Sequence, residues 1–345
     1  MIPNFFYRPE MLEYDFGSFH PLRPERLKKT IEVLDELHAI EPIASPPAKI
    51  EDLLRVHDME YIEAVQKAGT IPNPSEKKWT QFGLGTEDNP IFEKMHEKAL
   101  WYVGGSVAAA EKIRDGEKIS FNLSGGLHHA HRNRASGFCI YNDPAIMISI
   151  LRERFEKVAY IDIDVHHGDG VQWIYYDDPT VMTISIHESG RTLFPGTGFV
   201  NETGAENTSI NIPLEAYTTG DVWVWAFKEV VPRALEKFVP HAIVLQMGAD
   251  AHFDDPLAHL LVSVQEWLEA VRIVKSFGLP IAACGGGGYN LSTVPRMWSA
   301  ACILLGEENS SIIERFYDSS LPQPREQGKK EAERVVKELL ENVLK

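Results

Sequence analysis

The sequence predicts an α/β protein with a mostly parallel, buried β-sheet covered by helices. From about residue 91 onward, six short apolar runs rich in β-branched residues alternate with longer segments of helical spacing. Strands buried on both faces produce such continuous apolar runs, and parallel strands need a crossover helix between them. With 345 residues, of which 44% are hydrophobic and 24% charged, the chain can bury a large core.

Each expected element follows from its local hydrophobic period. Helices are expected at 90–114, 144–154, 221–238, 263–277 and 293–305, and strands at 118–123, 157–164, 181–187, 208–214, 242–247 and 280–284. Proline and glycine predict loops at 42–47 and 72–85. The charged segment 325–345 has helical spacing and is expected to form a solvated terminal helix. Because no repeat or convincing linker interrupts the chain, we expect a single domain over 1–345.

Five of the expected strands end in polar or glycine-rich clusters. These clusters lie at 125–129, 162–170, 187, 248–250 and 285–289. The carboxyl ends of parallel strands lie along one edge of the sheet, and open α/β folds bind their ligands at that edge. We therefore expect the five clusters to meet in one site.

The most informative cluster alternates acids and imidazoles as a strand ends. Because strand side chains alternate in direction, Asp162, Asp164 and His166 share one face. Neighbouring carboxylates repel each other unless a cation offsets their charge. A catalytic zinc usually has three protein ligands and leaves room for water, and Asp164, His166 and Asp250 fit that arrangement.

Further clusters supply candidates for proton transfer. His128 and His129 are adjacent imidazoles that can carry protons beside the metal. Each imidazole needs an acidic partner to hold its second nitrogen, and Asp162 and Asp169 are the available candidates. Tyr289 follows four glycines, which allow a close backbone approach, and its hydroxyl can stabilise an oxyanion.

Competing motifs are incomplete. Asn290 stands where a dinucleotide fingerprint needs its last glycine, and no phosphate-binding loop follows. The nucleophile elbow of serine hydrolases is absent around Ser124, and Cys139 is interpreted as a packed residue near the site. Eight further histidines lack metal-ligand spacing and are expected at the surface, in caps or in loops: His20, His38, His57, His96, His131, His241, His252 and His259.

Composition limits the class of partner. The formal charge of −16, from 34 basic and 50 acidic residues, argues against direct nucleic-acid binding. An acidic surface is compatible with cationic substrates. A role of the acidic residues in solubility explains the charge equally well. Three cysteines without zinc-finger spacing favour a reducing compartment over a disulfide framework. The sequence contains no secretory or membrane-spanning run, so we expect a cytoplasmic protein without a membrane partner.

Together the motifs resemble the zinc-dependent histone deacetylase family of the arginase/deacetylase superfamily. The resemblance rests on GGLHH at 125–129, ASGFC at 135–139, DIDVHHGDG at 162–170, FPGTG at 194–198, GAD at 248–250 and GGGGYN at 285–290, with His20, Pro21 and Arg26 near the start. GTEDNP at 85–90 is similar to the bacterial and archaeal acetoin-utilisation proteins. The resemblance implies a three-layer α/β/α fold with an eight-stranded parallel sheet and a core at about 14–305. The charged segment at about 325–345 is then a helical extension of that core.

The resemblance also implies roles for the site residues. His129, paired with Asp169, is the implied general base and acid, whereas His128, paired with Asp162, acts mainly electrostatically. Tyr289 polarises the amide carbonyl.

Bound ions are implied as well. Zinc is the expected catalytic ion, and Fe²⁺ suits the same three ligands. A potassium ion is implied, held by Ser185 and by the backbone carbonyls of Asp162, Asp164, His166 and Ile186. A second, outer ion is implied near Tyr175, Asp178 and Val181.

A narrow tunnel is expected to lead to the metal. Its wall, which holds the methylene chain of an acyl-lysine, is matched by Gly137, Phe138 and Phe194. Asp88 matches an acid at the rim that grips the substrate backbone, and Glu87 is a second candidate for that role. Arg26 matches a group beneath the zinc on the exit path of acetate.

The expected function is removal of acetyl or another short acyl group from lysine side chains of peptides or proteins. Leu257 stands where polyamine deacetylases carry a selective glutamate, which favours acyl-lysine, whereas Asp254 and Asp255 keep acetylpolyamines open as substrates. A dinuclear manganese ureohydrolase and a catalytically silent acyl-lysine-binding protein are two competing functions for the same motifs.

Overall fold

The computed structural model describes residues 3–70, 77–306, 309–326 and 328–345. Eight parallel strands form one sheet in the order β2-β1-β3-β8-β7-β4-β5-β6. The strands are β1 (Asn4–Phe6), β2 (Pro42–Ile43), β3 (Ile119–Asn122), β4 (Val158–Asp162), β5 (Val181–Glu188), β6 (Ser209–Leu214), β7 (Ala242–Gln246) and β8 (Ile281–Cys284). All six predicted strands are therefore present, and the eight-stranded α/β architecture is confirmed.

Two short strands at one side of the sheet were not predicted. The strands β1 and β2 have three and two residues, which is too short for a recognisable two-residue period. β1 is held by pairing with β3, and β2 by pairing with β1. The expectation of a loop over 42–47 is therefore wrong at its first two residues, because pairing with a strand distant in sequence decides their conformation.

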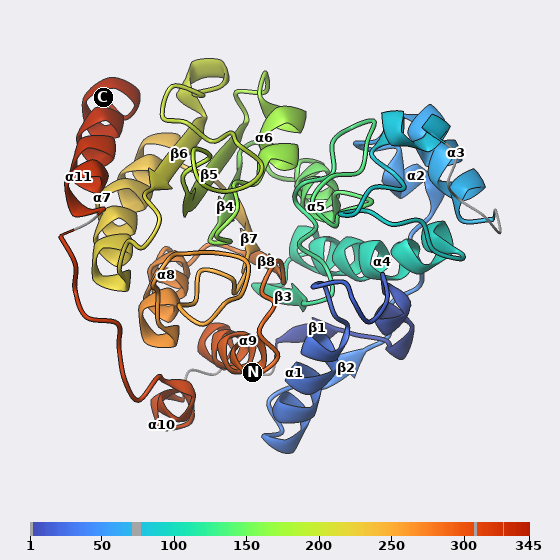
Figure 1. Ribbon diagram of the computed structural model, residues 1–345, viewed down its shortest axis with the longest axis horizontal. Helices are drawn as coiled ribbons and strands as arrows, with labels where there is room; N and C mark the ends of the chain where they lie inside the picture. The colour runs from blue at the N-terminus through green and yellow to red at the C-terminus, as the bar shows by residue number, and fades with distance from the viewer. Residues whose placement is uncertain (1–2, 71–76, 307–308, 327) are drawn as a thin grey trace.

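Helices cover both faces of the sheet (Figure 1). They are α1 (Glu25–Glu36), α2 (Ile50–Leu53), α3 (Met59–Ala68), α4 (Met95–Arg114), α5 (Asp143–Leu151), α6 (Asp169–Tyr175), α7 (Gly220–Phe238), α8 (Val264–Ser276), α9 (Thr293–Leu305), α10 (Ser310–Ile313) and α11 (Lys329–Glu338). The five predicted covering helices correspond to α4, α5, α7, α8 and α9. Short 3-10 turns at Pro9–Glu13, Lys77–Phe82, Ala205–Asn207 and Glu314–Phe316 complete the elements, and the predicted loop residues 72–76 lie outside the described part.

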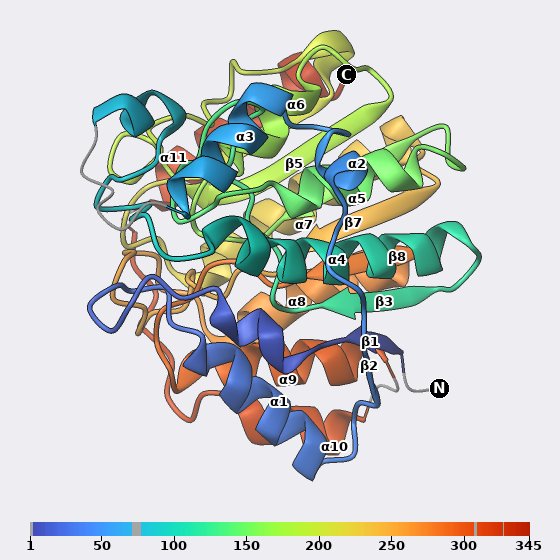
Figure 2. The same ribbon diagram turned by 90° about the vertical axis from the view of Figure 1, so that its right-hand side faces the viewer.

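The sheet separates two hydrophobic cores. On β4, Ile161 packs in the core that contains Trp223 of α7 and Trp298 of α9, whereas its neighbour Tyr160 packs in the core of α4 and α5. All five residues of β4 are buried because both faces are covered. Figure 2 shows α4 crossing in front of the strands, and α4 also contacts β3 and β8.

The C-terminal helix is not solvated all round, so that expectation is wrong. α11 continues into a π-helical turn at Leu339–Val343 and contacts α7 and β6. Its apolar residues recur at helical spacing and are buried: Ala332, Val335, Val336, Leu339 and Val343. Lys237 of α7 also donates to the carbonyl of Val343 over 3.0 Å. Among the described residues, no helix is both long and apolar enough to cross a bilayer.

Candidate metal centre and active site

The predicted clusters meet at the carboxyl ends of neighbouring strands. β3, β8, β7, β4 and β5 are consecutive in the sheet, and each leads into one of the five clusters. Asp164 follows β4 and Asp250 follows β7, its direct neighbour. The indole nitrogens of Trp267 and Trp298 donate to the carbonyls of Gly248 and Met247, over 2.9 and 2.7 Å, and so fix the segment that carries Asp250.

Three buried side chains form a compact group of metal-ligand atoms. The Nδ1 atom of His166 lies 3.1 Å from Asp164 Oδ1 and 3.1 Å from Asp250 Oδ2. One ligand atom from each of the three residues lies within 4.8 Å of the other two. One nitrogen and two carboxylate oxygens suit a catalytic divalent ion such as zinc.

The outer oxygens of both carboxylates are already held by protein donors. Asp164 Oδ2 accepts hydrogen bonds from Gln246 Nε2 at 2.9 Å and from the Gly287 N–H at 2.7 Å. Asp250 Oδ1 accepts from the Val165 N–H at 2.9 Å. These contacts orient the remaining oxygens toward His166, as second-layer hydrogen bonds do around metal ligands. The donor set therefore fits a metal ion.

The two buried carboxylates of this group repel each other, and a single imidazole offsets only part of their negative charge. Burial and then the charge of Asp164 raise the pKa of Asp250 to about 7. Burial opposes the charged form of His166, but its hydrogen bonds to Asp164 and Asp250 raise its pKa well above the ordinary value. A divalent cation among these atoms would displace the shared protons and offset the carboxylate repulsion.

Two histidine–aspartate pairs lie beside the candidate metal ligands. His128 Nδ1 lies 2.7 Å from Asp162 Oδ2, and His129 Nδ1 lies 2.6 Å from Asp169 Oδ1. The Nε2 atoms of the two imidazoles are 3.1 Å apart. The amide of Asn142 donates to the carbonyl of His128 and so anchors the turn that carries both histidines.

The two imidazoles have opposite electrostatic environments. Burial disfavours a charged His128, but the carboxylates of Asp162 and Asp164 outweigh it and raise the pKa to about 9. Burial and then the charge of His128 lower the pKa of His129 to about 4. Burial opposes a charged Asp169, but His129 keeps its pKa below the ordinary value. A neutral His129 can accept a proton near pH 7, because Asp169 holds its other nitrogen.

Tyr289 approaches the same centre after β8. Its N–H donates to Asp255 Oδ2 over 2.7 Å, and its ring lies 5.7 Å from that of Phe138. Burial raises the pKa of the Tyr289 hydroxyl well above its ordinary value, so the group stays a hydrogen-bond donor at neutral pH. The preceding glycines are required by space, because a Cβ on Gly287 would lie 2.0 Å from Asp250 Oδ2.

The predicted tunnel residues border His129 and Tyr289. Gly137 has φ +50°, and a Cβ there would lie 2.4 Å from His129 and 2.8 Å from Phe194. The ring of Phe194 is 5.0 Å from that of His129 and remains 41% exposed. Phe138, Gly137 and Tyr289 line a small cavity together with His129. The walls are therefore apolar close to the imidazole and open to solvent further out.

Arg26 lies beneath this cavity. Its guanidinium is buried and donates to the carbonyls of Gly286 and Gly288, over 2.7 and 3.0 Å. Burial lowers its pKa. A second small cavity shares Arg26, Leu22 and Leu127 with the catalytic one and continues from it toward Pro24.

The remaining predicted residues occupy less constrained positions. The candidate rim acids Glu87 and Asp88 are both exposed, and the carbonyl of Asp88 lies 3.3 Å from His20 Nε2. Leu257 is partly buried and donates its N–H to Asp255. In the sheet Asp162 is paired with Ser185, which brings two of the predicted potassium-binding residues side by side.

The groups of the second predicted ion are engaged in local hydrogen bonds. The carbonyl of Tyr175 accepts from the Asp178 N–H, and the carbonyl of Asp178 accepts from the Val181 N–H. The hydroxyl of Tyr175 points to the carbonyl of Ala145, 2.7 Å away.

Sequence reasoning missed several polar residues that support the site. Gln246 ends a strand that was treated as apolar, yet its amide holds Asp164. Asp143, at the start of α5, accepts from the N–H groups of Gly126 and Leu127 and fixes the turn before the histidine pair. Neither residue belongs to a cluster at a strand end, so only the fold reveals its contact.

The remaining histidines were expected at the surface, in caps or in loops, and several do lie in loops, but burial is commoner among them than that expectation implies. Four of them are buried: His20, His57, His96 and His252. Each finds a polar partner in the interior, for example the hydroxyl of Tyr141 for His96 at 2.8 Å. His131 lies 3.3 Å from the second oxygen of Asp169 and so touches the partner of His129.

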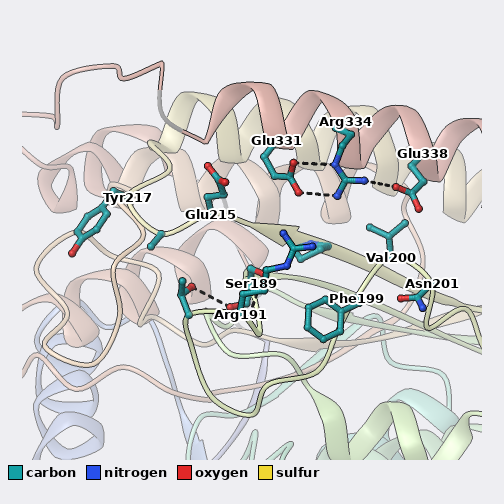
Figure 3. A pocket seen from close by; sticks show the side chains of 13 residues that line it. Ser189, Arg191, Phe199, Val200, Asn201, Glu215, Tyr217, Glu331, Arg334 and Glu338 are labelled. Carbon is teal, nitrogen blue, oxygen red and sulfur yellow. Dashed lines mark hydrogen bonds and ion pairs between the residues drawn. The ribbon is translucent and has the colours of Figure 1, made fainter.

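A larger cavity, of about 560 Å³, lies outside this site. It is formed by the loop after β5, the end of β6 and α11. Figure 3 shows Arg334 of α11 held between Glu331 and Glu338 at one edge, with Arg191 rising from the loop below. None of the candidate metal ligands lines it, so cavity size does not identify the reactive centre.

Comparison with known proteins places the chain in a family. Residues 20–305 match the model of the histone deacetylase domain. The chain is 42% identical over 309 residues to the acetoin utilization protein AcuC of Bacillus subtilis (strain 168), covering 86% of this chain and 80% of that protein. It is 39% identical over 332 residues to AcuC of Staphylococcus xylosus, covering 91% and 86%.

Solved structures agree with this placement. The crystal structure of a histone deacetylase homologue from Aquifex aeolicus superposes with a TM-score of 0.88 at 26% identity, covering 98% of this chain and 99% of that one. A histone deacetylase homologue complexed with SAHA gives a TM-score of 0.87 at 27% identity with the same coverage. The chain therefore belongs to the histone deacetylase family of deacetylase-type hydrolases, in the branch of the acetoin utilization proteins AcuC.

Proposed function

We propose that this protein is a zinc-dependent amidohydrolase that removes acetyl or other short acyl groups from lysine side chains of peptides or proteins. One observation carries the proposal: a buried group of two carboxylates and one imidazole lies beside a neutral histidine that an aspartate orients. Metal-assisted amide hydrolysis combines a Lewis acid, a base and an oxyanion donor in one place.

Asp164, His166 and Asp250 would hold the ion in this proposal. A bound zinc ion supplies Lewis acidity that polarises the amide carbonyl and favours ionisation of water near neutral pH. Fe²⁺ prefers similar ligands, so the ion used in the cell is a matter for metal analysis. A potassium ion at the backbone carbonyls near Asp162 and Ser185 belongs to the same proposal as a structural ion.

The protein's own residues perform the proton transfers. Neutral His129 Nε2 takes a proton from the attacking water, while Asp169 holds the Nδ1–H and stabilises the imidazolium that forms. The Tyr289 hydroxyl donates to the carbonyl oxygen as that oxygen gains negative charge. His129 then returns its proton to the leaving amine, so free lysine and a carboxylic acid depart.

His128 has a different proposed role. Its raised pKa keeps it charged near neutral pH, with Asp162 and the Tyr160 hydroxyl around its Nδ1 side. A charged imidazole 3.1 Å from His129 Nε2 stabilises negative charge in the transition state but cannot accept a proton.

The surroundings favour a lysine side chain over a free polyamine. Gly137, Phe138 and Phe194 supply an apolar wall that suits four methylene groups. Asp255 is one of the two acids that make acetylpolyamines an alternative substrate. It accepts hydrogen bonds from the N–H groups of Tyr289 and Leu257. Its carboxylate is buried and already accepts two N–H groups, which makes it a poor partner for a distal amine. The exposed acids Asp88 and Glu87 remain the two candidates for the rim residue that binds the backbone of a peptide substrate.

The proposal is tested with metal-stripped protein that is reloaded with zinc or iron. The substrates are acyl-lysine peptides of increasing acyl length and acetylated polyamines. We expect release of acetate from acetyl-lysine peptides only after metal is restored. Turnover restricted to acetylpolyamines would overturn the lysine assignment, and two tightly bound divalent ions per chain would instead favour a dinuclear hydrolase.

A further inference from the structure

A cavity of about 340 Å³ lies beside the catalytic pair and has no role in the reaction described above. Arg134, Trp173 and Phe194 are among its lining residues, and the carboxyl group of Asp169 also borders it. Its size lies within the range of pockets that hold side chains or small ligands.

Phe194 separates this cavity from the catalytic histidine. Its ring lies 5.0 Å from the ring of His129 and also lines the cavity. A group in the cavity is therefore about one aromatic ring away from the proposed path of the acyl-lysine chain. Consecutive residues of an extended peptide advance by roughly 3.3–3.6 Å, so a residue within two positions of the acyl-lysine can reach it.

The cavity contains an arginine without a carboxylate partner. The NH2 atom of Arg134 donates to His131 Nε2 over 3.2 Å, and within the described part of the chain Arg134 forms no ion pair. Arg134 is exposed, so its guanidinium is accessible to an external acceptor. A guanidinium binds a carboxylate through two parallel hydrogen bonds, which is a stronger contact than one to a neutral imidazole.

If Arg134 breaks its hydrogen bond to His131, the His131 imidazole still has a polar neighbour. His131 Nε2 also lies 3.3 Å from Asp169 Oδ2. A single imidazole nitrogen cannot accept from Arg134 and donate to Asp169 at the same time. When Arg134 turns to another acceptor, His131 Nε2 can donate to Asp169 instead. The change of partner therefore leaves the His131 nitrogen hydrogen-bonded.

The rest of the cavity suits a short acidic side chain. Trp173 is 39% exposed and offers an apolar wall for one or two methylene groups. Gln81, in the 3-10 turn Lys77–Phe82, also lines the cavity, and its exposed side chain offers an amide donor. Asp169 also borders the cavity but is paired with His129 and lies close to His131, so Arg134 is the lining group that can bind an acidic side chain.

We propose that this cavity is a carboxylate-binding subsite in which Arg134 recognises an acidic residue close to the acyl-lysine of the substrate. The proposal rests on the proposed deacetylase function and narrows its substrate class to acyl-lysine peptides with a neighbouring aspartate or glutamate. Arg134 acts in substrate recognition and takes no part in the proton transfers.

The test uses acetyl-lysine peptides that differ only by glutamate or glutamine at each of the two positions before and after the acetyl-lysine. We expect the zinc-loaded protein to have a kcat/KM roughly fivefold to tenfold higher for the glutamate peptide at one or more positions, mainly through a lower KM. R134Q should remove the preference and leave the glutamine peptides within about twofold of the unaltered protein.

R132Q is the matched control. Arg132 is exposed two residues away, carries the same charge and does not line the cavity. R132Q should keep the glutamate preference. R134E should reverse it, with a lysine peptide now preferred to the glutamate peptide. Equal losses in R132Q and R134Q would show a general effect of charge and overturn the subsite.

Binding of the same fluorescently labelled peptides, measured by anisotropy, separates the two proposals. A glutamate preference in binding that depends on Arg134 supports the subsite even when turnover is absent, and absent turnover contradicts the deacetylase function. Equal affinity for glutamate and glutamine peptides at every position overturns the subsite, whether or not acetyl-lysine is hydrolysed.

Discussion

His129 Nδ1 lies 2.6 Å from Asp169 Oδ1, and this contact joins the turn after β3 to the first residue of α6. The carboxylate fixes the orientation of the imidazole and directs its Nε2 toward His128 and the metal ligands. The contact orients His129 for its proposed role as the base. Burial and the charge of His128 keep His129 neutral, whereas Asp162 and Asp164 keep His128 charged.

The substitution Asp169→Asn should lower kcat by at least about a hundredfold, because the amide neither orients the required imidazole tautomer nor stabilises the imidazolium. Steady-state assays on an acetyl-lysine peptide measure the effect. Asp177→Asn, at an exposed position in the following turn, is the control and should keep full activity. Near-native turnover of Asp169→Asn would disprove the role given to this pair.

Replacing Tyr289 by phenylalanine should lower kcat by about a hundredfold or more and change KM little, because the hydroxyl acts on charge that develops during reaction. The ring contact with Phe138 is retained, so the melting temperature should stay within a few degrees. Tyr217→Phe, in the cavity of Figure 3, is the matched control. A mutant that loses affinity but keeps kcat would contradict the oxyanion role.

The two adjacent histidines should titrate far apart in the metal-free protein. We expect His129 to gain a proton only as the pH falls through about 4, and His128 to lose its proton as the pH rises through about 9. The charge of His128 thus adds stability below the unfolded pKa of about 6.5, and this contribution is lost as the pH rises through 9. Nitrogen-15 NMR of labelled histidine checks both values, and a His129 midpoint above 6.5 would contradict its neutral state.

Asp318 anchors the segment before the C-terminal helix, and its loss should destabilise the fold. Its carboxylate accepts from the Val264 N–H at 2.8 Å and pairs with Arg296 at 2.6 Å. Burial opposes the charge, but hydrogen bonds from His252, Val264 and Arg296 lower the pKa to about 2. Because the folded pKa is depressed, the stabilisation is present above the unfolded pKa near 4 and is lost as the pH falls toward 2.

Asp318→Asn should therefore lower the free energy of unfolding by about 1–2 kcal/mol at pH 7, after allowance for partial solvent screening. Urea unfolding at pH 7 and at pH 3 measures it, and the difference between mutant and unaltered protein should shrink at the lower pH. An equal difference at both pH values would contradict an ionic contribution.

The main architecture could be predicted from the sequence because buried parallel strands have a strong local signal. The runs that became β4 and β7 are apolar up to the polar residue that ends each strand, so their existence did not depend on knowing their neighbours. The strands β1 and β2 carry no such signal, since β1 depends on pairing with β3 and β2 on pairing with β1. The amphipathic stripe of α11 was present in the sequence but was outweighed by the helix's many charges.

The site could be anticipated for a related reason. Strand order decides which clusters meet, and a parallel sheet collects all carboxyl ends at one edge, so Asp164 and Asp250 were expected to converge. Residues that act from within elements, such as Gln246 and Asp143, could not be found in this way. Their contacts depend on side-chain directions that only the packed fold determines.

The most direct test of the account is a crystal structure of the gently purified protein with anomalous diffraction recorded on both sides of the zinc and iron absorption edges. We predict one transition-metal peak, bound by Asp164, His166 and Asp250, with no second such ion beside His128 and His129. Two adjacent transition-metal peaks, or one bound away from these three side chains, would contradict the account.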